Sequence, residues 1–232
     1  GKSKNETKNA IPNILSDALA VSFDQQIGHD YFVDADERFD FYHKVEHKIP
    51  FDLDLFNKIT NGGVPNKTLN VILAGTGVGK SLFMCHHAAN CYSANLNVLY
   101  ITCEMAEQRI AERIDANLMD LTMDELRHLP KITYDKKLQK ATANIKSKLI
   151  VKEYPTATAN VNHFRHLLEE LKLKKNFTPD VVFIDYLNIC ASARFKIGGN
   201  TNSYMYIKSI AEELRGLAVE WDVPIFTATQ TN

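Results

Sequence analysis

The sequence predicts a doubly wound α/β fold with a mostly parallel sheet. From Thr68 onwards, short apolar runs rich in β-branched residues alternate with stretches of helical periodicity. The apolar runs are continuous rather than interrupted by polar residues, which is typical of strands covered by helices on both faces. At 232 residues the chain is long enough for one such domain and an additional arm.

The alternation gives the predicted elements in order. The strands are expected at residues 69–73, 98–102, 149–151, 181–185 and 224–229. The helices are expected at residues 80–93, 105–118, 134–146, 161–174 and 204–220. No internal repeat or low-complexity tract interrupts this pattern.

Ahead of this core we expect an N-terminal arm. Residues 1–10 are polar and lysine-rich and are predicted to form a flexible tail. Residues 11–48 are predicted to hold a linker helix at 12–23 and a second helical stretch at 35–48, because apolar side chains recur there at helical spacing. The apolar face of a detached helix needs a covering surface, either the chain's own core at residues 49–232 or a neighbouring subunit.

The composition is that of a globular protein, with 45% hydrophobic residues and a formal net charge of −1. No apolar run approaches the roughly 20 residues of a membrane span, and the polar start GKSKNETKNA lacks a signal-peptide core. The four cysteines have no C-x-x-C spacing and are expected to be reduced core residues. We therefore expect a cytoplasmic protein without a membrane partner, in which only a local patch could contact nucleic acid.

A glycine-rich segment follows the first predicted strand. It reads AGTGVGKS and fits the phosphate-loop pattern G-x-x-x-x-G-K-[ST], with alanine in the first position. Such glycines let the backbone turn its N–H groups toward an anion, and the following helix adds its dipole. A turn without a ligand is the alternative, but the order of strand, loop, lysine, serine and helix favours a nucleoside triphosphate site. The expected binding residues are Ala74, Gly75, Thr76, Gly77, Val78, Gly79, Lys80 and Ser81.

Polar side chains lie at the ends of three predicted strands, where ligands of open α/β sheets bind. The run VVFID ends in Asp185, which we expect to support Mg²⁺ together with the Ser81 hydroxyl. The next residue is Tyr186, so a second acid is not available there to activate water. If ATP is hydrolysed, the base must come from elsewhere.

Glu104, beyond the strand at 98–102, is the candidate for that base. The alternative is a carboxylate that interacts with the dipole of the following helix. Gln230, at the end of the last strand, could bond to the γ-phosphate or its water, whereas a polar residue at a strand exit is the simpler reading. With Lys80, which would reach the β- and γ-phosphates, these are the expected catalytic residues.

Together these segments resemble the RecA-like motor domain of the DnaB-type replicative helicases. The matching stretches are AGTGVGKS, ITCEMA, IDYLNI and ATQ, with the lead-in PFDLDLFNKITNGG. RIDAN, LKLKKNF and AEELRGLAVE are similar to the replicative helicases of T-even-type bacteriophages. The resemblance runs from about Ile11 to Gln230, and EMA with IDYLNI is far more restrictive than the loop motif alone.

The resemblance implies a hexameric ring that encircles single-stranded DNA, moves 5′ to 3′ and hydrolyses ATP with Mg²⁺ between subunits. By position, Glu104 would be the catalytic glutamate, Asp185 the metal-supporting residue and Gln230 the sensor. The helix at 12–23 would pack on the next subunit. Primase and a helicase loader would be further partners, and a phage-encoded protein would act in the host cytoplasm.

The two ends of the sequence depart from the family pattern. The family's N-terminal domain is absent, and the chain starts without methionine. It stops after Asn232, before the remaining strands, second DNA-binding loop and arginine finger of the family. We therefore expect a core truncated at its C-terminal end, which can bind nucleotide without completing a neighbour's active site.

The segment SARFKIGGNTNS is the candidate DNA contact. It combines Arg194 and Lys196 with a glycine pair, which suits a loop that follows a phosphate backbone. Its charge alone would leave it as a mobile surface loop, and the resemblance is what favours DNA.

Two further arginines, Arg109 and Arg113, lie on one helical face after Glu104. They are expected either to pair with Glu112 or Asp115 or to contact a neighbour's nucleotide.

The sequence thus predicts an ATP-driven hexameric DNA helicase motor. The alternative class is a nucleotide-gated DNA-binding module, such as a recombinase-like filament former or a loader, that switches without unwinding. EMA and the predicted linker helix favour the helicase. A filament former should carry a short polymerisation strand in its N-terminal arm, and the sequence predicts none there.

Overall fold

The computed structural model describes residues 30–43, 47–195 and 202–230. The chain divides into two units, Gly1–Val45 and Glu46–Asn232. In the first unit the described helix is α2 (Ala35–His43), none of whose residues is buried. The predicted linker helix at 12–23 lies outside the described residues.

The prediction of a helix over 35–48 was wrong at its C-terminal end. Lys48 belongs instead to a short strand, β1 (Lys48–Ile49). This strand pairs in antiparallel orientation with β2 (Val64–Pro65). The physical reason is local, because Pro50 follows directly and a proline ring disfavours helical backbone in the residue before it.

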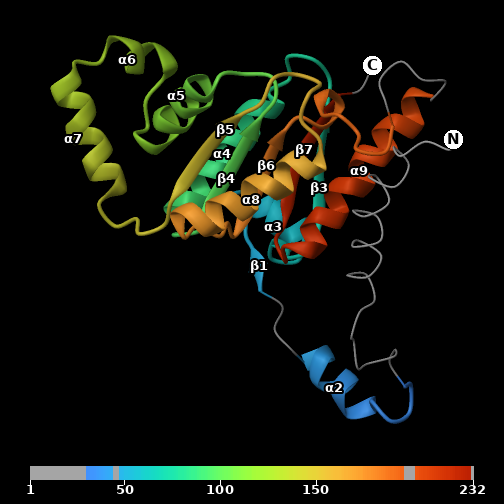
Figure 1. Ribbon diagram of the computed structural model, residues 1–232. Helices are drawn as coiled ribbons and strands as arrows, with labels where there is room; N and C mark the ends of the chain where they lie inside the picture. Colours follow the sequence, from blue (N-terminus) through green and yellow to red (C-terminus); the bar gives the residue numbers. More distant parts are fainter. Residues whose placement is uncertain (1–29, 44–46, 196–201, 231–232) are drawn as a thin grey trace, which may run out of the picture. The chain divides into compact units, whose positions relative to one another are not determined.

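The second unit is built on a five-stranded parallel sheet with the order β3-β7-β6-β4-β5 (Figure 1). Its strands are β3 (Leu69–Ala74), β4 (Val98–Thr102), β5 (Leu149–Glu153), β6 (Val181–Asp185) and β7 (Ile225–Gln230). The predicted strands agree with these to within two residues at either end. The predicted fold class, a doubly wound and mostly parallel sheet, is confirmed.

Helices cover both faces of this sheet (Figure 1). The described helices of this unit are α3 (Asp54–Ile59), α4 (Lys80–Ser93), α5 (Glu107–Leu118), α6 (Met123–His128), α7 (Lys131–Thr142), α8 (Val161–Lys175) and α9 (Ser203–Glu220), with a 3-10 turn, η1 (Leu187–Ile189), after β6. Of these, α6 and α7 contact α5. On one face, Leu168 of α8 and Leu214 of α9 share a core with Leu99. On the other, Met84 of α4 shares a core with Tyr100. Successive residues of β4 therefore face opposite cores, which is why the strand is apolar throughout.

The strand order brings several strand ends to one edge of the sheet. Ala74 at the end of β3 lies opposite Gln230 at the end of β7. Thr102 at the end of β4 lies opposite Asp185 at the end of β6. Because all these strands are parallel, their carboxyl ends share the edge at which the loop between β3 and α4 begins.

The segment between β4 and β5 holds more helix than predicted. The sequence led us to expect one helix at 134–146, whereas α6 and α7 precede and overlap it. Thr122 caps α6: its hydroxyl accepts from the Glu125 N–H, and the Glu125 carboxylate accepts from the Thr122 N–H at 2.8 Å. Pro130 then caps α7, where its missing N–H costs no helical hydrogen bond.

The four cysteines are buried and free, so the predicted reduced core thiols are confirmed. Burial raises the pKa of Cys85 to about 11, which makes this thiol a poor nucleophile. Among the described residues, no helix combines the length and apolar character that a membrane crossing requires.

Candidate active site

The loop between β3 and α4 turns the chain at the edge of the sheet. Gly77 and Gly79 have φ values of 72° and 107°, a region that side chains rarely adopt. A Cβ atom added to either glycine would meet nothing within 4 Å, so both face open space. Val78 between them is 70% exposed and leaves the inner side of the loop to the backbone.

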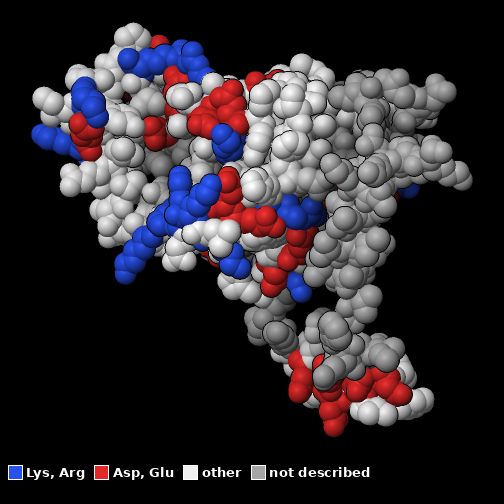
Figure 2. All heavy atoms as spheres, viewed as in Figure 1, with Lys and Arg blue, Asp and Glu red and all other residues white. Residues whose placement is uncertain are grey.

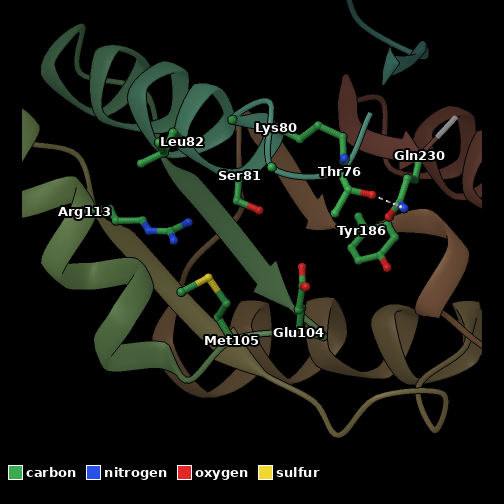
Figure 3. Close-up of a pocket in the computed structure, with 11 residues that line it drawn as sticks. Thr76, Lys80, Ser81, Leu82, Glu104, Met105, Arg113, Tyr186 and Gln230 are labelled. Carbon is green, nitrogen blue, oxygen red and sulfur yellow. Dashed lines mark hydrogen bonds between the residues drawn. The ribbon is translucent and has the colours of Figure 1, made fainter. Parts of the chain in front are cut away.

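Two polar side chains meet at this loop. The Lys80 ammonium donates to the carbonyl oxygens of Ala74 at 3.1 Å and Gly75 at 2.8 Å, so the cation lies within the curve of its own loop. The Gln230 side-chain amide donates to the Thr76 hydroxyl at 2.5 Å (Figure 3). The end of β7 is thereby connected to the phosphate loop.

Asp185 is fully buried at the end of β6. The Tyr100 hydroxyl donates to its Oδ2 atom at 3.0 Å, whereas its Oδ1 atom is buried without a hydrogen-bond partner. Burial raises the pKa of Asp185, and the Ser81 and Tyr100 hydroxyls and the positive charges of Arg113 and Lys80 oppose this. Carboxylate and hydroxyl oxygens are hard donors, so this set of residues fits Mg²⁺.

Glu104 follows β4 and is exposed, and its carboxylate points into the pocket (Figure 3). Tyr186, the residue after Asp185, lies on the side of the pocket near Gln230 (Figure 3). Its pKa is raised by burial and by the negative charges of Glu104 and Asp185. In the sequence, Tyr186 was notable only because it stands where a second acidic residue could have followed Asp185. Its place in the pocket lining was not predicted.

The pocket enclosed by these elements has a volume of about 260 Å³. Its lining residues are Thr76, Gly77, Gly79, Lys80, Ser81, Leu82, Glu104, Met105, Arg113, Tyr186 and Gln230. The structure therefore brings five of the eight predicted loop residues (Thr76, Gly77, Gly79, Lys80 and Ser81) together with Glu104 and Gln230, whereas Ala74, Gly75 and Val78 do not line the pocket. Asp185 is not part of the lining because it lies beneath the surface.

The two arginines of α5 have different surroundings. Arg109 pairs with Glu112 at 2.9 Å. Arg113, one helical turn further on, points its guanidinium into the pocket (Figure 3). Asp115 accepts a hydrogen bond from the Tyr134 hydroxyl at 2.8 Å. Of the alternatives left open by the sequence, carboxylate pairing describes Arg109, whereas Arg113 lines the pocket of its own chain.

The candidate DNA residues are not part of this pocket. The Arg194 guanidinium pairs with Glu212 of α9 at 2.9 Å. Lys196 lies outside the described residues.

A parallel sheet with a phosphate loop at its carboxyl edge, a lysine inside that loop and a buried carboxylate beside it define a RecA-like nucleotide-binding domain. Comparison with known sequences shows to which family of such domains the chain belongs. The chain belongs to the family of DnaB-like helicase C-terminal domains, which matches residues 49–232.

The relatives are replicative helicases. The chain is 47% identical over 224 residues to the DnaB-like replicative helicase of Enterobacteria phage T4, covering 95% of this chain and 47% of that protein. It is 26% identical over 183 residues to the replicative DNA helicase DnaB of Synechocystis, covering 78% of this chain and 20% of that protein. The chain therefore spans about half of the phage relative and less of the bacterial one.

Solved structures agree on the fold. A DnaB-like replicative helicase, studied with its interactions with primase, superposes with a TM-score of 0.65 at 20% identity, over 93% of this chain and 51% of that one. A second solved structure, an ATPase domain, superposes with a TM-score of 0.66 at 18% identity, over 86% of this chain and 69% of that one.

Proposed function

We propose that this chain is the ATP-hydrolysing motor domain of a replicative DNA helicase that translocates 5′ to 3′ on single-stranded DNA. The observation that carries the proposal is the convergence of Lys80, Glu104 and Gln230 on one pocket, from three separate elements. Membership of the DnaB-like family and the phage relative support the same activity.

In this proposal each residue has one task. Lys80 binds the β- and γ-phosphates, and the N–H groups of the loop surround them. Ser81 and Asp185 hold Mg²⁺, which offsets the charge of the phosphates when it is bound. Glu104 accepts the proton of the attacking water. Gln230 contacts the γ-phosphate, and its bond to Thr76 gives the loop a direct connection to β7.

The base is tested by Glu104→Gln, which keeps the shape of the side chain and removes its charge. ATP binding should survive, while turnover falls by roughly 10²-fold or more. Binding is measured with a fluorescent ATP analogue and turnover by phosphate release. Glu107→Gln, on the first turn of α5 and outside the pocket lining, is the matched control. Near-normal hydrolysis by Glu104→Gln would remove this residue from the mechanism.

Beyond the nucleotide, we infer the partners from the family. The core at residues 49–232 would assemble as a hexameric ring, with the helix at 12–23 on the next subunit and the tail at 1–10 free. The segment with Arg194 and Lys196 would contact DNA inside the ring. Primase and a loader are the remaining proposed partners, and the cytoplasm of a phage host is the proposed location.

The competing function is a nucleotide-gated DNA-binding module that does not unwind. Full-length protein with ATP and Mg²⁺ should displace a strand from a forked duplex with a 5′ tail. Failure of strand displacement with intact ATP turnover would favour the module. Electron micrographs with an ATP analogue add a second distinction, since rings support the helicase and filaments a recombinase-like protein.

A further inference from the structure

The β4 strand places a tyrosine beneath the metal-supporting carboxylate. Tyr100 lies opposite Phe183 of β6, and Asp185 is two residues further along that strand. Side chains two residues apart on a strand share one face, so Tyr100 and Asp185 are diagonal neighbours across the β4–β6 pair. The contact follows from strand register and not from nearness in the sequence.

The tyrosine ring is held rigidly. It is 0% exposed and stacks on Phe183, with ring centroids 5.8 Å apart and an interplanar angle of 11°. Phe183 in turn stacks on Phe226 of β7 at 5.2 Å. An aromatic column across three strands therefore fixes where the Tyr100 hydroxyl lies.

The Tyr100 hydroxyl makes two hydrogen bonds. It donates to Asp185 Oδ2 at 3.0 Å and accepts from the Cys85 thiol of α4 at 3.7 Å. Because the thiol supplies its own proton to the phenol oxygen, the phenol proton is left for the carboxylate. The other carboxylate oxygen, Oδ1, is buried and has no hydrogen-bond partner. The Tyr100 hydroxyl thus holds Oδ2 of Asp185, and Oδ1 has no protein partner that would compete with a metal ion.

We propose that Tyr100 is a positioning residue for Mg²⁺ binding, whose hydroxyl fixes the Asp185 carboxylate so that the second oxygen serves the metal with Ser81. This inference rests on the proposed nucleotide function of the site. Tyr100 does not line the pocket. Groups that orient a metal ligand in this way typically change metal affinity by roughly 10- to 100-fold when they are removed.

The test is Tyr100→Phe, which removes the hydroxyl and keeps the stacked ring. Binding of a fluorescent ADP analogue is titrated with Mg²⁺ and, separately, measured in EDTA. The Mg²⁺ concentration for half-maximal enhancement of binding should rise by roughly 10-fold or more, with metal-free affinity unchanged. Direct Mn²⁺ binding, measured by electron paramagnetic resonance with ADP present, should weaken by the same factor.

The matched control is Tyr134→Phe. Tyr134 also donates to an aspartate, Asp115, at 2.8 Å, but this pair lies outside the pocket lining. Its loss should leave the Mg²⁺ titration unchanged. Replacement of Tyr100 by 4-aminophenylalanine, which retains a donor at the same place, should restore the metal dependence. An equal effect of both phenylalanine variants, or a failure of the amino group to rescue, would overturn the proposal.

Asp185→Asn separates this inference from the proposed function. If Asp185→Asn weakens the response to Mg²⁺ and Tyr100→Phe does not, Tyr100 has no positioning role and the metal site stands. If Asp185→Asn also has no effect, the proposed metal site itself is wrong. If Tyr100→Phe is insoluble, the 4-aminophenylalanine variant is titrated alone, and a weakened metal response in a folded protein counts against the proposal.

Discussion

At the scale of single residues, charge is unevenly distributed around the pocket. Lys80 lies inside the phosphate loop, while Arg113 enters from α5 on the other side (Figure 3). Both positive charges lower the pKa of Asp185, against the larger effect of burial. A nucleotide would therefore meet cations from two directions, and the arginine can offer a forked set of donors to phosphate oxygens.

We expect Arg113→Gln to weaken binding of a triphosphate analogue by roughly 10-fold or more, because a hydrogen bond to a charged group contributes about 1.5–3 kcal/mol. Arg109→Gln is the matched control, since Arg109 is on the same helix and its side chain is 60% exposed and paired with Glu112. Isothermal titration with a non-hydrolysable ATP analogue measures both variants. Equal affinities for the two would place Arg113 outside the nucleotide contacts.

At the scale of elements, α9 anchors the start of the candidate DNA segment. Figure 2 shows the Lys, Arg, Asp and Glu residues on one face of the molecule. Glu213 is 7% exposed and accepts from the Ser192 hydroxyl at 2.7 Å and the Ala193 N–H at 2.9 Å. The Ser209 hydroxyl, also on α9, donates to Ser192 at 2.9 Å. This network holds the backbone at Ser192 and Ala193, just before Arg194, against α9.

Glu213→Ala should lower the free energy of unfolding by about 2 kcal/mol, because it leaves the buried Ser192 hydroxyl without its acceptor and removes the acceptor of the exposed Ala193 N–H. Glu212→Ala, one position earlier, should cost less than about 1 kcal/mol, since its pair with Arg194 is half-exposed. Urea denaturation compares the two. Single-stranded DNA binding by Glu212→Ala should be unchanged or stronger, because Arg194 is released. A smaller cost for Glu213→Ala than for Glu212→Ala would contradict this account.

At the scale of the second unit, a buried histidine connects its N-terminal lead-in to the sheet. His87 of α4 is 1% exposed, stacks on Phe51 at 4.6 Å and meets the edge of Phe226 at 4.8 Å. Burial lowers the pKa of His87 to about 4, with a weaker opposing effect of Asp52 and a small further lowering by His86. The imidazole is therefore neutral in the folded protein at neutral pH.

The sign of the pH effect follows from linkage. Below the ordinary pKa of 6.5 the unfolded chain takes up a proton at His87, while the folded chain does so only near pH 4. The contribution of His87 to the free energy of unfolding is fully present above pH 6.5. It should fall by about 3 kcal/mol as the pH decreases to 4, at roughly 1.4 kcal/mol per pH unit. His87→Phe should remove this part of the slope in urea denaturation measured from about pH 4 to 8. His128→Gln, an exposed histidine of α6, should retain the full slope. Identical slopes for both variants would contradict the assignment.

The sequence alone predicted the class of fold, the five strands, the phosphate loop and three polar strand ends. These features are local, since apolar runs, glycines and the residues that follow a strand can be read from neighbours in the chain. A shared sheet edge was also predictable, because parallel strands end together. The capping box at Thr122 and Glu125 was also predictable from the spacing of these residues, but α6 was not predicted.

Only the tertiary structure decided which side chains from other elements reach the pocket. Arg113 differs from Arg109 by one helical turn, and the packing of α5 against α4 determines which of them faces the site. In the sequence pattern, Tyr100 cannot be distinguished from the other apolar residues of a buried strand. Only the register of β4 against β6 brings its hydroxyl to Asp185. Register and helix orientation depend on contacts between residues far apart in the chain. A single sequence therefore indicates the elements of such a site but not the neighbours that orient them.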